Sequence, residues 1–329
     1  MQNKKVNAIL ILVLLTLLES CAFSSSEDIV AYEGFPKEIS LNADSVSMQK
    51  MYDNVFMTLS GGKLVVSSVK ADTMMHFYST PTLDYLFAAG VKGHGKDEMQ
   101  SFPTFCKSMK SELYVRGFTT NSIRKFTVLD DKLIEKNKYE LYLADVPNDM
   151  YIQNDTLLYF NDLFHYEVKC YSINNNKTSH KFHLADLYGN PSNKEVLLGT
   201  LCMNDSLAIY AFQYKHEIVV LNTKYLSYIK TVRWRYENQD SKVSSPDGHP
   251  CLYYTDGYTT SRRHYLLYRG SDSKQKNVHF AIEVYDNDFQ PVCKYVLDRR
   301  IFNIVVDEAN GYIYGLGKSD DYIYRYKLR

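Results

Sequence analysis

Pairs of short apolar segments recur along most of the chain. In Asn54–Val69 (NVFMTLSGGKLVVSSV), an apolar segment, a small turn and a second segment of alternating apolar residues follow one another. This alternation has the period of a β-strand with one buried face, and the turns hold the residues that tight β-connections need. Related pairs lie at Thr104–Phe118, Asp149–Asp162, Gly199–Gln213, His249–Gly270 and Asn303–Gly317.

A second hairpin follows each of the first five pairs, for example VKCYSINNNKTSHKF after the third. Equivalent positions of the six units are 44 to 58 residues apart when aligned on Leu64, Leu113, Leu157, Leu207, Tyr265 and Tyr312. Four-stranded units at this spacing indicate a β-propeller. The pattern therefore predicts an all-β protein, a six-bladed β-propeller of four-stranded antiparallel blades.

The last unit has only three strands of its own, the third being Tyr322–Arg329. An unpaired strand edge invites association, and closed architectures remove it. The segment Phe35–Leu41 (FPKEISL) has strand character and belongs to no unit. We expect this N-terminal segment to complete the last blade and close the ring, so that residues 33–329 form a single propeller domain.

The N-terminus has a different pattern. Lys4 and Lys5 precede the apolar run Ala8–Leu18 (AILILVLLTLL). A run of this length is too short for a membrane-spanning helix and is typical of a signal peptide. We expect residues 1–20 to be the signal peptide, and residues 21–32, with the polar segment Ser24–Asp28, to be a flexible tether.

The residues Leu18-Glu19-Ser20-Cys21 resemble a bacterial lipobox. The resemblance implies that Cys21 becomes the N-terminus and carries acyl chains such as palmitate, which anchor a protein stably when two or more are present. Ala22, rather than Asp, after this cysteine implies the outer membrane.

The repeats, the lipobox and the glycine-rich loop Gly90–Phe102 (GVKGHGKDEMQSF) together resemble the TolB-like six-bladed β-propeller lipoproteins of Gram-negative bacteria. That group implies a fold and a tether, but no settled activity.

The amino-acid composition bears on the partners, the secondary structure and the cysteines of the protein. The chain has 329 residues, with 38 Lys and Arg against 38 Asp and Glu. A balanced charge gives no reason to expect a nucleic-acid partner, because nucleic acid favours a basic face. The 29 tyrosines favour strands. We expect the five cysteines beyond Cys21 to be buried small apolar residues, with disulfides left open; they are Cys106, Cys170, Cys202, Cys251 and Cys293.

Two clusters on the long blade-to-blade connections are candidates for ligand binding, because binding residues concentrate on loops of a rigid scaffold. The first is His94, Lys96, Asp97 and Glu98, with a glycine-rich connection as the alternative. The second is Arg233, Trp234 and Arg235, which suits a sugar ring or a protein partner. Its alternative is a tryptophan packed on a neighbouring blade.

No catalytic motif and no metal-ligand spacing occurs, so we expect no catalytic residue, metal or cofactor. The leading hypothesis is a lipid-anchored envelope protein that binds a protein or glycan without catalysis. One alternative is a metal-dependent envelope hydrolase or lyase with its site at the channel mouth, drawing on His249, Asn303 or Asp307. Another is a purely structural scaffold.

Overall fold

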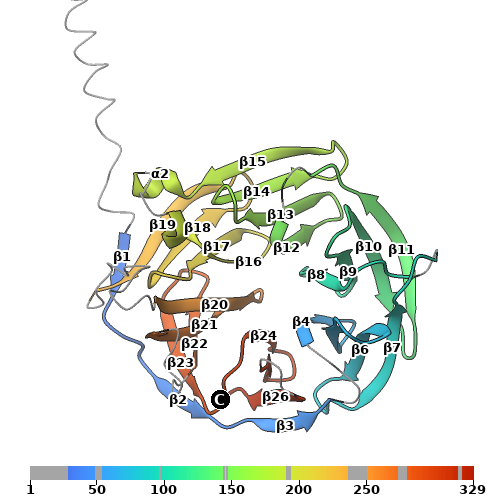
Figure 1. Ribbon diagram of the computed structural model, residues 1–329. Coiled ribbons are helices and arrows are strands. Elements are labelled where there is room, and N and C mark those ends of the chain that lie inside the picture. Colours follow the sequence, from blue (N-terminus) through green and yellow to red (C-terminus); the bar gives the residue numbers. More distant parts are fainter. Residues whose placement is uncertain are drawn as a thin grey trace, which may run out of the picture.

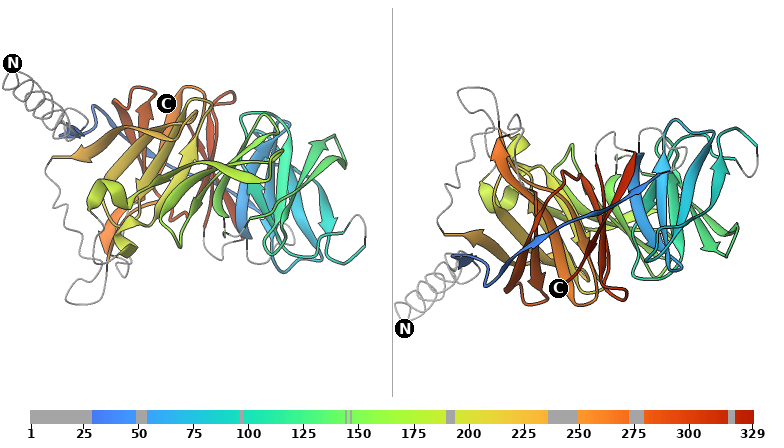
Figure 2. Two further views of the ribbon diagram at one scale, coloured as in Figure 1. Left: turned by 90° about the horizontal axis from the view of Figure 1, so that it is seen from above. Right: turned by 90° about the horizontal axis from the view of Figure 1, so that it is seen from below.

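The computed structural model describes residues 29–48, 54–95, 98–143, 145, 147–189, 194–235, 250–272, 280–317 and 321–329. Six β-sheets of these residues are arranged as the blades of a ring, which Figure 1 shows along its axis and Figure 2 from two sides. The predicted six-bladed β-propeller of four-stranded antiparallel blades is confirmed. The lipobox and the apolar run before it lie outside the described residues.

Blades one to three follow one another along the chain, each with neighbouring strands in sequence order. Blade one contains β4 (Asn54–Ser60), β5 (Lys63–Ser68), β6 (Thr73–Ser79) and β7 (Tyr85–Val91). Blade two contains β8 (Pro103–Cys106), β9 (Leu113–Gly117), β10 (Ser122–Val128) and β11 (Leu133–Glu140). Blade three contains β12 (Pro147–Gln153), β13 (Leu157–Asp162), β14 (Glu167–Ser172) and β15 (Lys177–His183).

Blades four to six each take up a strand from the N-terminal segment. Blade four contains β16 (Gly199–Met203), β17 (Leu207–Phe212), β18 (Glu217–Asn222) and β19 (Ser227–Trp234). Blade five contains β20 (Cys251–Thr259), β21 (Arg263–Asp272), β22 (Ala281–Asp286) and β23 (Pro291–Leu297). Blade six contains β24 (Asn303–Asp307), β25 (Tyr312–Leu316) and β26 (Tyr322–Lys327).

The N-terminal segment runs along the outside of these three blades (Figure 1). First β1 (Ile29–Tyr32) pairs in parallel with β19, and then β2 (Glu38–Leu41) pairs in parallel with β23. Finally β3 (Asp44–Ser47) pairs antiparallel with β26 and supplies the fourth strand of blade six. An N-terminal strand thus completes the last blade, as predicted.

The prediction that Phe35–Leu41 is the closing segment is wrong. Within that segment, β2 becomes a fifth strand of blade five, and the closing strand follows it in the chain. The structure also includes Ile29–Tyr32, assigned from the sequence to the tether, in blade four.

Apolar side chains fill the contacts between neighbouring blades. A cluster of buried residues lies between each adjacent pair of described blades, for example Leu64, Tyr78 and Tyr314 between blades one and six. Many tyrosines are fully buried because their hydroxyls find acceptors, as Tyr210 Oη does at 2.8 Å from the Leu197 carbonyl. This use of the phenol explains how the fold buries so many tyrosines.

The connection between blades three and four holds a short helix, α2 (Ala185–Tyr188), and a 3₁₀ turn, η2 (Lys194–Leu197). No helix in the described part of the chain has the length and apolar character to cross a membrane. The five described cysteines are free. Four of them are buried, as predicted, whereas Cys251 is only half-buried.

Candidate functional site

The first strands of the blades, β4, β8, β12, β16, β20 and β24, stand around the axis of the ring. Lys107 follows β8 at this axis, and its backbone joins two of these strands. The Lys107 amide donates to the Met150 carbonyl at 2.8 Å, and the Ile152 amide donates to the Lys107 carbonyl at 2.9 Å. This bridge fixes the lysine between blades two and three.

The side chain of Lys107 reaches across the axis to blade five. Its Nζ donates to the Gly257 carbonyl at 2.9 Å and lies 3.7 Å from Oδ1 of Asp256. Burial opposes the charge, but the nearby carboxylates, Asp256 above all, outweigh burial and raise the pKa of Lys107. The lysine is therefore a charged cross-channel tie.

Two cavities meet at Lys107, which lines both. The upper cavity, of about 520 Å³, is lined by the first residues of several inner strands, including Thr104, Asn148 and Asn303. The lower cavity, of about 410 Å³, is lined by the turns at the other ends of these strands, including Ser60 and Asp307. The axis of the propeller is thus divided into two chambers.

Two carboxylates of the upper cavity hold the next blade in place. Asp149 of β12 accepts a hydrogen bond from the Leu201 amide of blade four at 3.0 Å. Asp256 of β20 accepts from the Ile304 amide of blade six at 2.7 Å, and also from Nδ2 of Asn303 at 2.7 Å. Burial raises the pKa of Asp149, against the lowering effect of Lys107. Both carboxylates therefore have structural roles.

The loop candidates lie on the connection between blades one and two. His94 and Glu98 are exposed and line a separate cavity of about 400 Å³ beside blade two. The Glu98 carboxylate accepts a hydrogen bond from the Gly95 amide at 2.7 Å, so it shapes its own loop. Lys96 and Asp97 lie outside the described residues.

The second predicted cluster is on blade four and does not converge with the first. Trp234 is only 6% exposed and packs against Phe35 and His216, with ring centroids 4.9 and 5.2 Å away. Arg233 pairs with Glu217 at 3.0 Å, and Arg235 with Glu33 at 2.6 Å. The indole of Trp234 is buried between blades four and five. Trp234 is therefore a tryptophan packed on a neighbouring blade, which was the alternative to ligand binding, and it offers no open face to a ligand.

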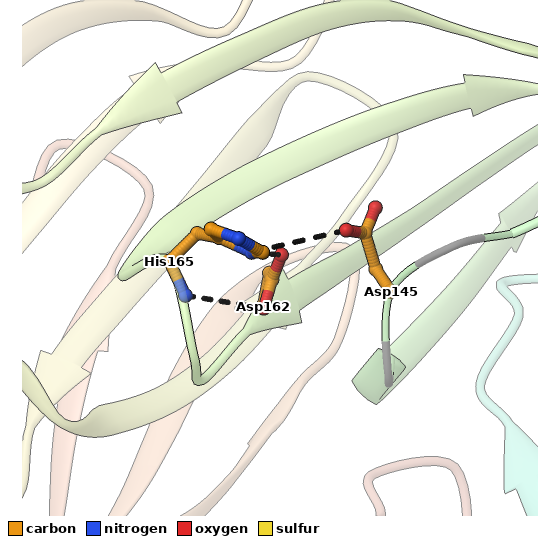
Figure 3. Close-up of side chains that lie close together, drawn as sticks. All are labelled: Asp145, Asp162 and His165. Atoms are coloured by element: carbon orange, nitrogen blue, oxygen red, sulfur yellow. Dashed lines mark hydrogen bonds and ion pairs between the residues drawn. The ribbon is translucent and has the colours of Figure 1, made fainter.

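A third polar cluster combines Asp145, Asp162 and His165 at blade three (Figure 3). Their ligand atoms lie close enough together to hold a metal ion. However, Nζ of Lys169 lies 3.0 Å from Asp145 and 2.7 Å from Asp162, and also 3.0 Å from Glu167. The lysine ammonium already neutralises these carboxylates, so we interpret the cluster as an ion-pair network.

Sequence reasoning missed Lys107, Asp149 and Asp256. The available signal was a charged residue within the first strand of a unit, or directly after it. His249, an earlier candidate, lies outside the described residues. Asn303 supports Asp256, and Asp307 caps a turn by accepting from the Asn310 amide at 3.1 Å.

These features define a six-bladed β-propeller with an axial channel that a lysine divides. The chain belongs to the TolB-like 6-blade propeller-like family, which matches residues 33–309. No curated protein matches the chain.

Two solved structures are similar in fold. A putative exported protein from Bacteroides fragilis has a TM-score of 0.55 and 11% identity, over 92% of this chain and 98% of that chain. Streptogramin B lyase has a TM-score of 0.53 and 13% identity, over 88% of this chain and 98% of that chain. At such identities the likeness concerns the fold alone.

Proposed function

We propose that this protein is an exported, lipid-anchored envelope protein whose propeller binds a glycan in the upper cavity without converting it. The observation that supports this function is the cavity itself. Its volume of about 520 Å³ lies in the range of small-molecule sites, and its wall combines polar side chains with aromatic rings. A cavity of this size favours a saccharide over a folded protein as the ligand.

The chemistry of the channel favours binding over metal-dependent hydrolysis. The carboxylates of Asp149 and Asp256 are each bonded to a backbone amide of the next blade. Among the described residues, the cluster with metal-ligand geometry is Asp145, Asp162 and His165, and none of these three residues lines the upper cavity. The likeness to a lyase is too distant to favour an enzyme.

An envelope location is supported by three observations of different kinds. The lipobox around Cys21 implies acylation, the family carries the TolB-like fold, and a similar structure is that of an exported protein. We propose that the lipid anchor is at Cys21 and that the protein is located at the outer membrane.

The test is a thermal-shift screen of the full chain in detergent against neutral and acidic oligosaccharides, divalent metals and a chelator. A ligand at 100 times its Kd adds about 2.7 kcal/mol of stability. We expect a saccharide to stabilise the protein, Thr255→Phe in the upper cavity to abolish the shift, and Ser108→Phe in the lower cavity to retain it. Stabilisation by metal alone, reversed by the chelator, would contradict the proposal.

A further inference from the structure

Arg116 is a buried cation at the upper cavity. It is the fourth residue of β9, pairs with Thr104 of β8, and is only 6% exposed. Together with Lys107 it lines the upper cavity. Two positive side chains therefore belong to one chamber.

Arg116 differs from Lys107 and Lys169 in its partners. Lys107 pairs with Asp256, and Lys169 lies among three carboxylates. Arg116 has no ion pair with any carboxylate in the described ranges, and its Nε has no hydrogen-bond acceptor. Burial lowers the pKa of its guanidinium, with no carboxylate to offset the effect. An uncompensated buried charge is costly, and functional sites are where proteins retain one.

Two further polar atoms at the same cavity lack protein partners. Asn303 donates its Nδ2 to Asp256, but its Oδ1 is buried without a donor. Thr255 Oγ1 is likewise buried and unpaired. Buried polar groups are nearly always satisfied, so three such atoms on residues that line one chamber call for a ligand with matching groups. Arg116 would donate hydrogen bonds to an anionic group, and Thr255 and Asn303 would bond to hydroxyls.

An aromatic surface completes the chamber. Phe118 lines the upper cavity, is 51% exposed, and stacks on Phe102 with ring centroids 4.6 Å apart and an interplanar angle of 20°. A half-exposed ring beside polar groups suits the apolar face of a sugar, since aromatic walls with a few polar groups are the usual form of such sites.

We propose that the upper cavity binds a saccharide that carries a carboxylate, with the carboxylate on Arg116. The ring hydroxyls bond to Thr255 and Asn303, and the ring lies against Phe118. A planar guanidinium matches a carboxylate in two parallel hydrogen bonds, which an ammonium cannot reproduce. The inference rests on the proposed function and adds the chemical class of the ligand.

Calorimetric titration of the full chain with digalacturonate and with its uncharged counterpart galactobiose tests this assignment. We expect digalacturonate to bind at least about tenfold tighter, because a charged hydrogen-bonded pair contributes about 1.5 kcal/mol or more. Arg116→Met should reduce this preference to near unity without lowering Tm, since it removes an unpaired buried charge. Arg116→Lys should retain only part of it, and the matched control Lys110→Met, an exposed cation at the lower cavity, should retain all of it.

The outcomes separate the two proposals. Equal binding of both disaccharides, abolished by Thr255→Phe, would overturn the carboxylate assignment and leave the glycan-binding function standing. Equal competition by inorganic phosphate would also overturn it, because the site would then recognise charge without the sugar. A preference that survives in Arg116→Met and Arg116→Lys alike would show that another cation carries the recognition and would overturn the role of Arg116.

Discussion

Nζ of Lys107 and the carbonyl oxygen of Gly257 lie 2.9 Å apart, although 150 positions separate them in the chain. This hydrogen bond connects blade two to blade five across the axis of the ring. Gly257 is required there because a Cβ would collide with Sγ of Cys202. The tie across the axis thus joins a long side chain that lines the upper cavity to a residue that has no side chain.

Replacing Lys107 by Met should lower the free energy of unfolding by about 2 kcal/mol, because a charged hydrogen bond is lost and Asp256 loses its counter-ion. Urea denaturation followed by tryptophan fluorescence measures the change. Lys110→Met, at an exposed position nearby, should stay within about 0.5 kcal/mol of the natural protein. Equal stability of both variants would show that the cross-channel tie is not a net contributor.

The ion-pair network of blade three should make the free energy of unfolding depend on pH in the acidic range. Burial alone would raise the pKa of Asp162, but hydrogen bonds from Lys169 and His165 outweigh it and lower the pKa to about 2. An unfolded Asp titrates near 3.9, so this group adds stability above about pH 4 and loses it as pH falls towards 2.

The lowered pKa corresponds to a contribution of about 2 kcal/mol to the free energy of unfolding. The natural protein should lose this contribution on acidification, whereas Asp162→Asn, which lacks the carboxylate, should not. Unfolding free energies of the natural protein and the variant should therefore converge between about pH 5 and pH 2. Parallel pH curves would contradict the assignment of the lowered pKa to this carboxylate.

The closing strand should matter more than the outer strand that precedes it. Replacing all four residues of β3 by glycine leaves β26 with an open edge and removes Val46 from the contact between blades six and one. The same replacement in β1 strips a fifth strand from a blade that retains four. We expect the β3 variant to lose several kcal/mol more in thermal unfolding; equal losses would contradict the role of β3 in closure.

The anchor is tested by Cys21→Ser. This variant should lose incorporation of labelled palmitate and move from the membrane fraction to the soluble fraction. Cys251→Ser, which changes a half-buried cysteine of the propeller, should retain both properties. A Cys21→Ser protein that remains acylated would defeat the lipoprotein proposal.

The repeat pattern was sufficient to predict the blades because each unit carries its own alternation and turns. All six aligned positions, from Leu64 to Tyr312, fall within the first three residues of the second strand of their blade. The strand that closes the ring was harder to locate from the sequence. Residues 38–41 and 44–47 both have strand character, and only tertiary pairing decides that β3, and not β2, meets β26.

The site could not be derived in the same way, because bulges change which face a residue occupies. The pairing of β12 with β13 shifts between Asn148 and Tyr151, and that of β20 with β21 shifts on both sides of Tyr254. A strict two-residue period therefore misplaces Asp149 and Asp256 relative to the axis. Trp234 shows the opposite case, since flanking arginines suggest exposure while the indole packs between blades.

The path of residues 29–47 has a mechanical consequence. A pull on the chain ahead of Ile29 would reach the ring first at β1, which lies parallel to β19 over four residue pairs. The load would next meet β2, again parallel to its neighbour, before it reached the strand that closes the ring. Two outer strands thus shield the ring closure from force transmitted through the N-terminal segment.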